Sequence, residues 1–184
     1  FRLSNDSSNN TIRSSVIEGA ATSGTNGVIS LGTGAATGND NNVVTDNQIR
    51  DRSNAAGVPS LLVSSSGTSS AIANSSNTIS NNELFNFANT AILISSTGNE
   101  SWTISSNTIY AITAPLVRSS ALTGISLGSV GANTISQNVI RDLDTSLPAT
   151  GVSVTGTGAT TVSRNRIYDF SSTAGSAQPL TGIQ

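Results

Sequence analysis

Several residue types are absent or scarce in this 184-residue chain. There is no cysteine, which excludes a disulfide framework and a thiolate metal site. There is no histidine and no lysine, so all eight basic residues are arginine. Charged residues make up 10 % of the chain, against about 25 % in an ordinary soluble domain. The formal net charge is −2 and no basic stripe exists, so nucleic acid is not an expected partner.

Long hydrophobic runs are absent as well. No run approaches the ~20 apolar residues of a membrane span, and we expect no membrane insertion. Methionine is also missing, so we expect a processed chain or a fragment of a longer protein, in which residues 1–184 form a single repeat region. Serine, threonine, asparagine and glycine replace the usual charged residues. Such a lysine-free, uncharged polar composition favours an extracellular or cell-surface location.

A short motif recurs six times along the chain. Its pattern is x-T-I-S-x-N-x-I, as in the segment NTISNNEL of residues 77–84. Successive copies are 25 to 35 residues apart, so the motif is fixed while the insertions fall in loops. The first Ile or Val of the copies lies at Ile12, Val44, Ile79, Ile104, Ile135 and Val162.

A second element, Gly-apolar-x-apolar, follows each copy. Apolar residues that alternate with a period of two are typical of strands with one buried face. Each repeat then holds three short strands, and about six such coils predict an all-β solenoid whose strands pair in parallel ~4.8 Å apart. The apolar pairs of the second element are Ile29/Leu31, Leu61/Val63, Ile92/Ile94, Ile125/Leu127 and Val152/Val154, followed by Ile183.

These two motifs resemble the repeats of the right-handed parallel β-helix family. That family includes secreted carbohydrate-binding and sugar-cleaving proteins and adhesin-like surface proteins. The resemblance runs from about Asn10 to Gln184 and implies a right-handed parallel β-helix of three-strand coils. The resemblance supports a strong inference about the fold and only a weak one about function, because the family includes lyases, hydrolases, epimerases, adhesins and inert stalks.

The asparagine of each motif forms a column across the coils. Its amide has both donors and an acceptor, so stacked amides can bond one another and the backbone of the turn. Ligand contact is the alternative, but a turn between buried strands needs these bonds, and we interpret the column as structural. The predicted ladder is Asn47, Asn82, Asn107, Asn138 and Asn165, with Ser15 in its place in the first copy.

The residue after the second Ile gives another column, in which Arg141 is flanked by two tyrosines. Arginine stacks on aromatic faces, and sugars dock on exposed rings, so this column is a candidate for glycan contact. The alternative is a surface stacking ladder without a ligand. Trp102, which replaces the usual asparagine, either covers an edge of the core or serves as a binding platform. The candidate ligand-binding residues are Phe85, Tyr110, Arg141, Tyr168 and Trp102.

The carboxylates give no catalytic centre by themselves. Asp142 and Asp169 would lie one coil apart, about 5 Å by strand spacing, which matches a retaining carboxylate pair. Aspartate that caps a turn is far commoner, and two acidic side chains are too few for a calcium site of six to eight ligands. We therefore predict no catalytic residues, no metal site and no cofactor. Loop insertions vary on one side of the solenoid, with residues 113–123 as the loop most expected to carry binding.

Three functions are compatible with these features. The first is a noncatalytic extracellular or cell-surface solenoid, adhesin-like or a structural stalk, that contacts polysaccharide. The second is a fragment of a polysaccharide lyase or glycoside hydrolase whose active site lies outside this chain. The third is a subunit or cargo of a surface filament, secretion or motility assembly, with other proteins of that assembly as partners. The absence of His and Lys and the scattered acids favour the first.

Overall fold

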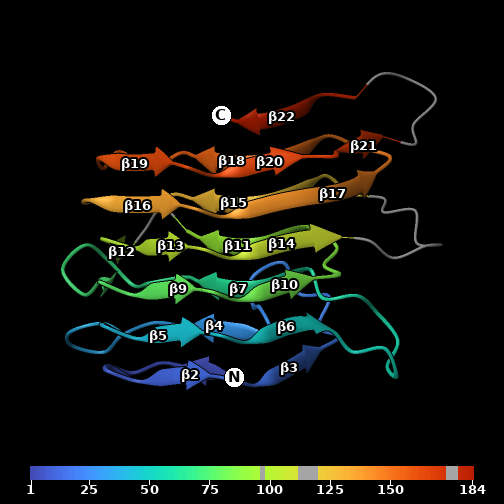
Figure 1. Cartoon of the computed structure of the whole chain (residues 1–184). Coiled ribbons are helices and arrows are strands. Elements are labelled where there is room, and N and C mark those ends of the chain that lie inside the picture. Colours follow the sequence, from blue (N-terminus) through green and yellow to red (C-terminus); the bar gives the residue numbers. More distant parts are fainter. Residues whose placement is uncertain (96–97, 112–119, 173–177) are drawn as a thin grey trace.

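The computed structural model describes residues 1–95, 98–111, 120–172 and 178–184. Its chain winds as a parallel β-solenoid, with each coil stacked on the one before it (Figure 1). All regular elements of these residues are strands. The same residues contain no helix with the length and hydropathy of a membrane span. Residues 112–119, most of the loop predicted to carry binding, lie outside the described part.

The T-I-S segments form the first of three long sheets. Each strand pairs in parallel and in register with its counterparts; Ile104, for example, lies between Ile79 and Ile135. The central aliphatic residue points into the solenoid, and the residues on either side of it face outward. The strands of this sheet are β2 (Thr11–Arg13), β5 (Val43–Thr45), β9 (Thr78–Ser80), β13 (Thr103–Ser105), β16 (Asn133–Ser136) and β19 (Thr160–Ser163).

The N-x-I segments form the second sheet, with the same parallel register. Leu84, for example, lies between Ile49 and Ile109. Its strands are β3 (Val16–Gly19), β6 (Gln48–Asp51), β10 (Glu83–Phe85), β14 (Thr108–Ala111), β17 (Val139–Thr145) and β20 (Arg166–Tyr168), and β21 (Ser171–Ser172) also pairs with β17.

The Gly-apolar-x-apolar segments form the third sheet. A separate two-stranded sheet pairs β8 (Asn74–Ser75) with β12 (Asn99–Glu100). The strands of the third sheet are β1 (Arg2–Leu3), β4 (Ile29–Leu31), β7 (Leu61–Ser65), β11 (Thr90–Ile94), β15 (Leu122–Leu127), β18 (Ala149–Val154) and β22 (Leu180–Ile183).

The register of β7 differs from the sequence alignment. Val63, and not Leu61, pairs with Ile29, which places Ser65 opposite Leu31. The apolar run of residues 61–63 fits either alignment, because three consecutive apolar residues carry no alternation. Ser65 is buried at this inward position, where its hydroxyl donates to the Asn99 amide oxygen and accepts from the Asn74 amide.

The three sheets confirm the predicted three-strand coil. The number of turns is slightly smaller than the six coils predicted. Six copies of the first strand, β2 to β19, bound five complete turns, and the strands before and after them belong to incomplete ones.

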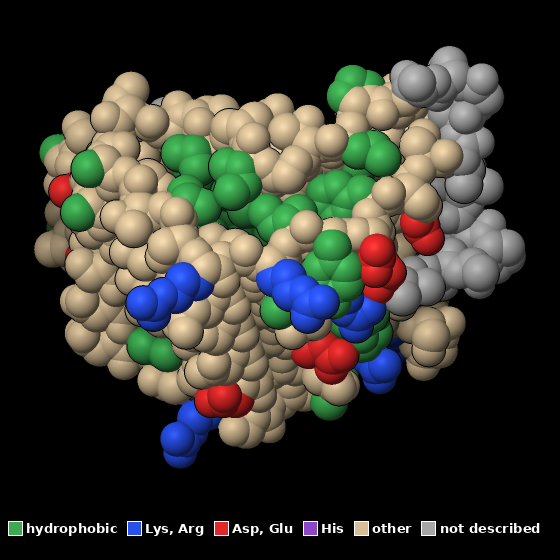
Figure 2. Space-filling view, turned by 45° about the horizontal axis from the view of Figure 1, so that its top comes forward, with side chains coloured by type: hydrophobic (Ala, Val, Ile, Leu, Met, Phe, Trp, Pro, Cys, Tyr) green, Lys and Arg blue, Asp and Glu red, His purple; other side chains and the backbone are tan. Residues whose placement is uncertain are grey.

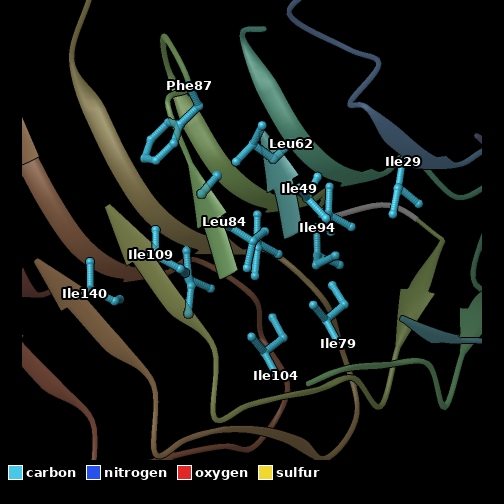
Figure 3. Packing of buried hydrophobic residues seen from close by; sticks show 14 of the residues in the cluster. Ile29, Ile49, Leu62, Ile79, Leu84, Phe87, Ile94, Ile104, Ile109 and Ile140 are labelled. Atoms are coloured by element: carbon cyan, nitrogen blue, oxygen red, sulfur yellow. The ribbon is translucent and has the colours of Figure 1, made fainter. Parts of the chain in front are cut away.

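Aliphatic side chains from all three sheets meet in a single interior (Figure 3). Ile79 and Ile104 come from the first sheet, Leu84 and Ile109 from the second, and Ile94 from the third. Each is at most 1 % exposed. Burial of a side chain of this size contributes roughly 1.5–3 kcal/mol, so the stacked aliphatic columns are the main source of stability.

The corner between the first and second sheets uses one left-handed residue per coil. A single residue with positive φ turns the chain between the two strands, at a cost of roughly 1–2 kcal/mol for a side chain other than glycine. These residues are Ser14, Asp46, Asn81, Ser106, Gln137 and Arg164, with φ between 52° and 58°. The ladder asparagine follows directly and satisfies the backbone that the turn leaves unpaired.

The asparagine ladder runs without a gap from Asn47 to Asn165. Asn107 is fully buried, and its Oδ1 accepts from the backbone N–H and the Nδ2 of Asn82, both at 3.0 Å. Its own backbone N–H and Nδ2 donate to Asn138 Oδ1, and Nδ2 also donates to the Ile79 carbonyl at 2.9 Å. Every bond of the amide therefore joins this coil to a neighbouring coil.

Two further ladders were not predicted. In one, the backbone N–H of Asn10 donates to Asn42 Oδ1, and the backbone N–H of Asn42 donates to Asn77 Oδ1. In the other, Asn39 donates its N–H and Nδ2 to Asn74 Oδ1, each at 2.9 Å. The ladder of Asn10, Asn42 and Asn77 corresponds to a signal in the sequence, the asparagine that recurs directly before the T-I-S segment.

Replacing Asn107 with alanine tests the ladder. The substitution removes the acceptor of the buried Asn82 backbone N–H and the side-chain donor to the Ile79 carbonyl, while the backbone N–H of residue 107 still bonds Asn138 Oδ1. Each buried polar group that loses its partner costs about 1–3 kcal/mol. We expect a loss of about 3 kcal/mol in the free energy of unfolding, measured by urea titration followed by circular dichroism. Ser105→Ala, on the outward face of the same coil, should change it by less than about 0.5 kcal/mol. Equal losses in the two variants would contradict the proposed role of the ladder.

Candidate functional site

The column after the second Ile forms one continuous file on the outward face of the second sheet. The strand pairings place its members opposite one another from coil to coil, and its side chains are partly exposed. The file consists of Glu18, Arg50, Phe85, Tyr110, Arg141 and Tyr168. Figure 2 shows charged side chains of both signs next to hydrophobic ones on this side of the molecule.

The members of this file stack face to face along the solenoid axis. The Phe85 and Tyr110 rings lie 5.0 Å apart, centroid to centroid, with 3° between their planes. The Arg50 guanidinium lies over the other face of Phe85 at 5.6 Å, and that of Arg141 lies 4.6 Å from the Tyr110 centroid. At the N-terminal end, Arg50 Nη2 is 2.7 Å from Glu18 Oε1. Both faces of the Phe85 and Tyr110 rings are therefore occupied by neighbours.

This geometry changes the expectation for glycan contact. The structure brings Phe85, Tyr110 and Arg141 together as predicted, and Tyr168 lies opposite Arg141 with the Arg166 guanidinium 4.4 Å from its ring. A sugar stacks on a free ring face, and Phe85 and Tyr110 present only their edges to solvent. The contacts seen are those of the stacking ladder, worth about 0.5–1.5 kcal/mol per pair.

Of the two interpretations of Trp102, the structure supports the one that places its side chain at the core. Its side chain is 1 % exposed and belongs to the core cluster. The indole N–H donates to the Asn74 carbonyl at 3.1 Å, and the backbone N–H donates to Asn133 Oδ1 at 2.9 Å. A residue in this column points inward, so a large apolar ring here fills the interior and cannot form a surface platform.

A hydrogen-bonded side-chain network lies beside the stacked rings. Tyr110 Oη donates to Glu83 Oε1 at 2.7 Å, and Gln48 Nε2 donates to Glu83 Oε2 at 2.8 Å. Burial raises the pKa of Tyr110 to about 12, and the hydrogen bond and negative charge of Glu83 act in the same direction. The carboxylate of Glu83 is thus held in a fixed position on the outward face of the second sheet. No short pattern in the sequence predicts this network, because its three members come from different coils.

Asp142 is the extra residue of a bulge within β17, and Asp169 directly follows β20. Their φ values are 51° and 54°, and the Arg141 guanidinium forms an ion pair with Asp142. That ion pair raises the pKa of Arg141 above its ordinary value, mainly through the hydrogen bond to Asp142. Within the described residues, no group of three His, Cys, Asp or Glu side chains is placed to hold a metal ion.

Replacing Trp102 with asparagine, the usual residue of its column, should destabilise the protein. The variant gains one ladder position but loses a fully buried indole, and comparable truncations cost about 3–5 kcal/mol. We expect the free energy of unfolding to fall by about 3 kcal/mol, measured by thermal and urea unfolding. Thr160→Asn places the same residue in the same column of a half-buried copy and should be neutral or slightly stabilising. Stabilisation by Trp102→Asn would contradict this account.

The phenol of Tyr110 should titrate at unusually high pH. Its pKa of about 12 lies above the ordinary value of 10, so the neutral form and its bond to Glu83 are favoured in the folded chain. This stabilisation is fully present below pH 10 and is lost as the pH rises through 12. Ultraviolet titration of the phenolate should detect the shift, and Glu83→Gln should lower the pKa. An unchanged value in Glu83→Gln would exclude the negative charge of Glu83 as a cause, because the glutamine oxygen can still accept the hydrogen bond.

Residues 71–182 match the family described as the right handed beta helix region. The match covers more than half of the chain and begins just before β8. No curated protein and no solved structure matches the chain. Together with the three parallel sheets, the match shows that the chain belongs to the right-handed β-helix family.

Proposed function

We propose that this chain is a noncatalytic section of an extracellular or cell-surface β-helix protein, in which the solenoid acts as a rigid, adhesin-like scaffold. The observation that carries the proposal is the direction of the polar contacts. The amide ladders and the stacked file of the second sheet join each coil to the next along the axis. A catalytic centre instead needs several ionisable groups directed at one point.

The charged side chains support the same role. Asp6 accepts backbone N–H bonds from Ala36, Thr37 and two adjoining residues, at 2.9–3.1 Å. These bonds, led by that of Ala36, lower the pKa of Asp6 to about 2. Asp40 likewise accepts from the backbone and the hydroxyl of Ser75. Each carboxylate links two coils, as a scaffold requires.

The composition supports a place outside the cell. The outward positions of the first sheet are mostly threonine and serine, with Thr103 and Ser105 as an example. Hydroxyl side chains keep a long repetitive surface hydrated without charge, and strand positions favour threonine. The scaffold is therefore polar on the outside and aliphatic inside, with only 10 % charged residues in the whole chain.

Two measurements test this proposal. Incubation of the chain with homogalacturonan, alginate and xylan should give no new reducing ends and no unsaturated sugar absorbance. Antibodies raised against it should label intact, unpermeabilised cells of the source or detect it in their medium. Turnover of any of these polymers that resists a second purification would overturn the noncatalytic role, and purely intracellular labelling would overturn the location.

A further inference from the structure

Four asparagines of this chain begin a triplet Asn-x-Ser or Asn-x-Thr whose middle residue is not proline. This acceptor triplet is the sequence at which N-glycosylation attaches a bulky, hydrophilic glycan to the asparagine amide. The fold divides the four into an outer pair on the surface and an inner pair in the interior. The outer pair is Asn5 and Asn9, and the inner pair is Asn74 and Asn99.

The outer pair lies in the connection between β1 and β2, where both side chains are exposed. The backbone N–H groups of Asn5 and Asn9 donate to the carbonyls of Thr33 and Asp40, each at 2.9 Å, and these bonds hold the backbone in place. Within the described residues, neither side-chain amide has a hydrogen-bond partner. A glycan on either amide therefore extends into solvent and displaces no contact of the fold.

The inner pair joins two coils, because β8 and β12 lie in register and place Asn74 opposite Asn99. Both residues are 0 % exposed. Asn74 Nδ2 donates to the Gly32 carbonyl and to Ser65 Oγ, each at 2.9 Å. Asn99 Nδ2 donates to the carbonyl and the hydroxyl group of Ser95, each at 3.1 Å. Both hydrogens of each amide are therefore engaged inside the protein.

We propose that a glycan on Asn74 or Asn99 prevents this chain from folding, whereas Asn5 and Asn9 accept a glycan without loss of the fold. In the modification, the asparagine Nδ2 forms a bond to C1 of a lipid-linked oligosaccharide. The bond between C1 and the pyrophosphate oxygen of the lipid breaks, and the amide loses one proton. The modified nitrogen keeps a single hydrogen, so an inner asparagine can no longer serve both of its acceptors.

The loss of one donor leaves a buried acceptor unpaired, which destabilises the fold. Space is the second obstacle. Strands of successive coils are ~4.8 Å apart, so no sugar ring fits between the coils beside Asn74 and Asn99. The packing at this corner is close even for a methyl group, because a Cβ added to Gly98 would collide with the backbone nitrogen of Thr68.

The inner pair also limits how the chain can reach the outside of the cell, and this consequence rests on the extracellular location proposed above. A glycosylating enzyme that meets the chain before it folds has access to all four triplets. Modification of the inner pair at that stage would block the stacking of the coils. The chain is therefore exported by a route on which it folds before, or without, contact with such an enzyme.

The test is translation of the whole chain, behind a signal sequence that is cleaved, into microsomes that contain the glycosylating enzyme. Mass spectrometry after amidase treatment assigns the glycans to individual asparagines, and resistance to thermolysin reports folding. We expect molecules with a glycan on Asn74 or Asn99 to be degraded. Resistant molecules should carry glycans on Asn5 and Asn9 only.

Two double variants separate the pairs. Ser76→Gly with Ser101→Gly removes the inner triplets, and glycine adopts the positive φ of these positions, 54° and 55°, without strain. This variant should raise the resistant fraction several-fold, because folded abundance responds to small changes in stability by such factors. Ser7→Ala with Thr11→Ala removes the outer triplets as the matched control and should leave the fraction unchanged. Translated without microsomes, both variants should be as resistant as the wild-type chain.

Resistant molecules with a glycan on Asn74 or Asn99 would overturn the proposal, as would an inner-pair variant whose resistant fraction does not rise. Absence of glycans from Asn5 and Asn9 in that variant would overturn their role as acceptors. Wild-type molecules without glycans at the inner pair would overturn the conclusion about the export route. The scaffold role is tested by polymer turnover and cell labelling instead, so the two proposals fail separately.

Discussion

Hydrogen bonding between successive coils is the constraint on which the rest of this structure depends. Parallel strands stack at ~4.8 Å, so every side chain meets its counterpart from the next coil at about that distance. Asparagine tolerates this arrangement because its amide can donate and accept at once, and Asn107 uses both capacities fully. A column built from one type of charged side chain would place like charges next to one another, which is unfavourable. The neutral amide avoids this repulsion, which explains why the ladders are built from asparagine.

The same constraint explains how repeats of unequal length fit one solenoid. The corner between the first two sheets has a fixed length, with one left-handed residue in each coil followed by one ladder residue, which is asparagine in every copy except the first. Insertions are confined to the other connections, where they do not disturb the strand register. The sequence reflects this arrangement as a motif of constant length that recurs at steps of 25–35 residues.

The outward file of the second sheet shows how stacking also limits function. Rings that stack along the axis stabilise one another, and in doing so Phe85 and Tyr110 lose the faces that a sugar would use. The hydroxyl group of Tyr110 in turn donates a hydrogen bond to the Glu83 carboxylate of the preceding coil.

The sequence alone determined the strand types, the inward residues and the main asparagine ladder, because each depends on a short local pattern that repeats. It also placed the stacked file correctly, since equal positions in a motif become neighbours. It did not determine the register of β7, the burial of Trp102 or the orientation of the rings. Those features depend on side chains that belong to other coils, about 25–35 residues away, and only the packed tertiary structure brings them into contact.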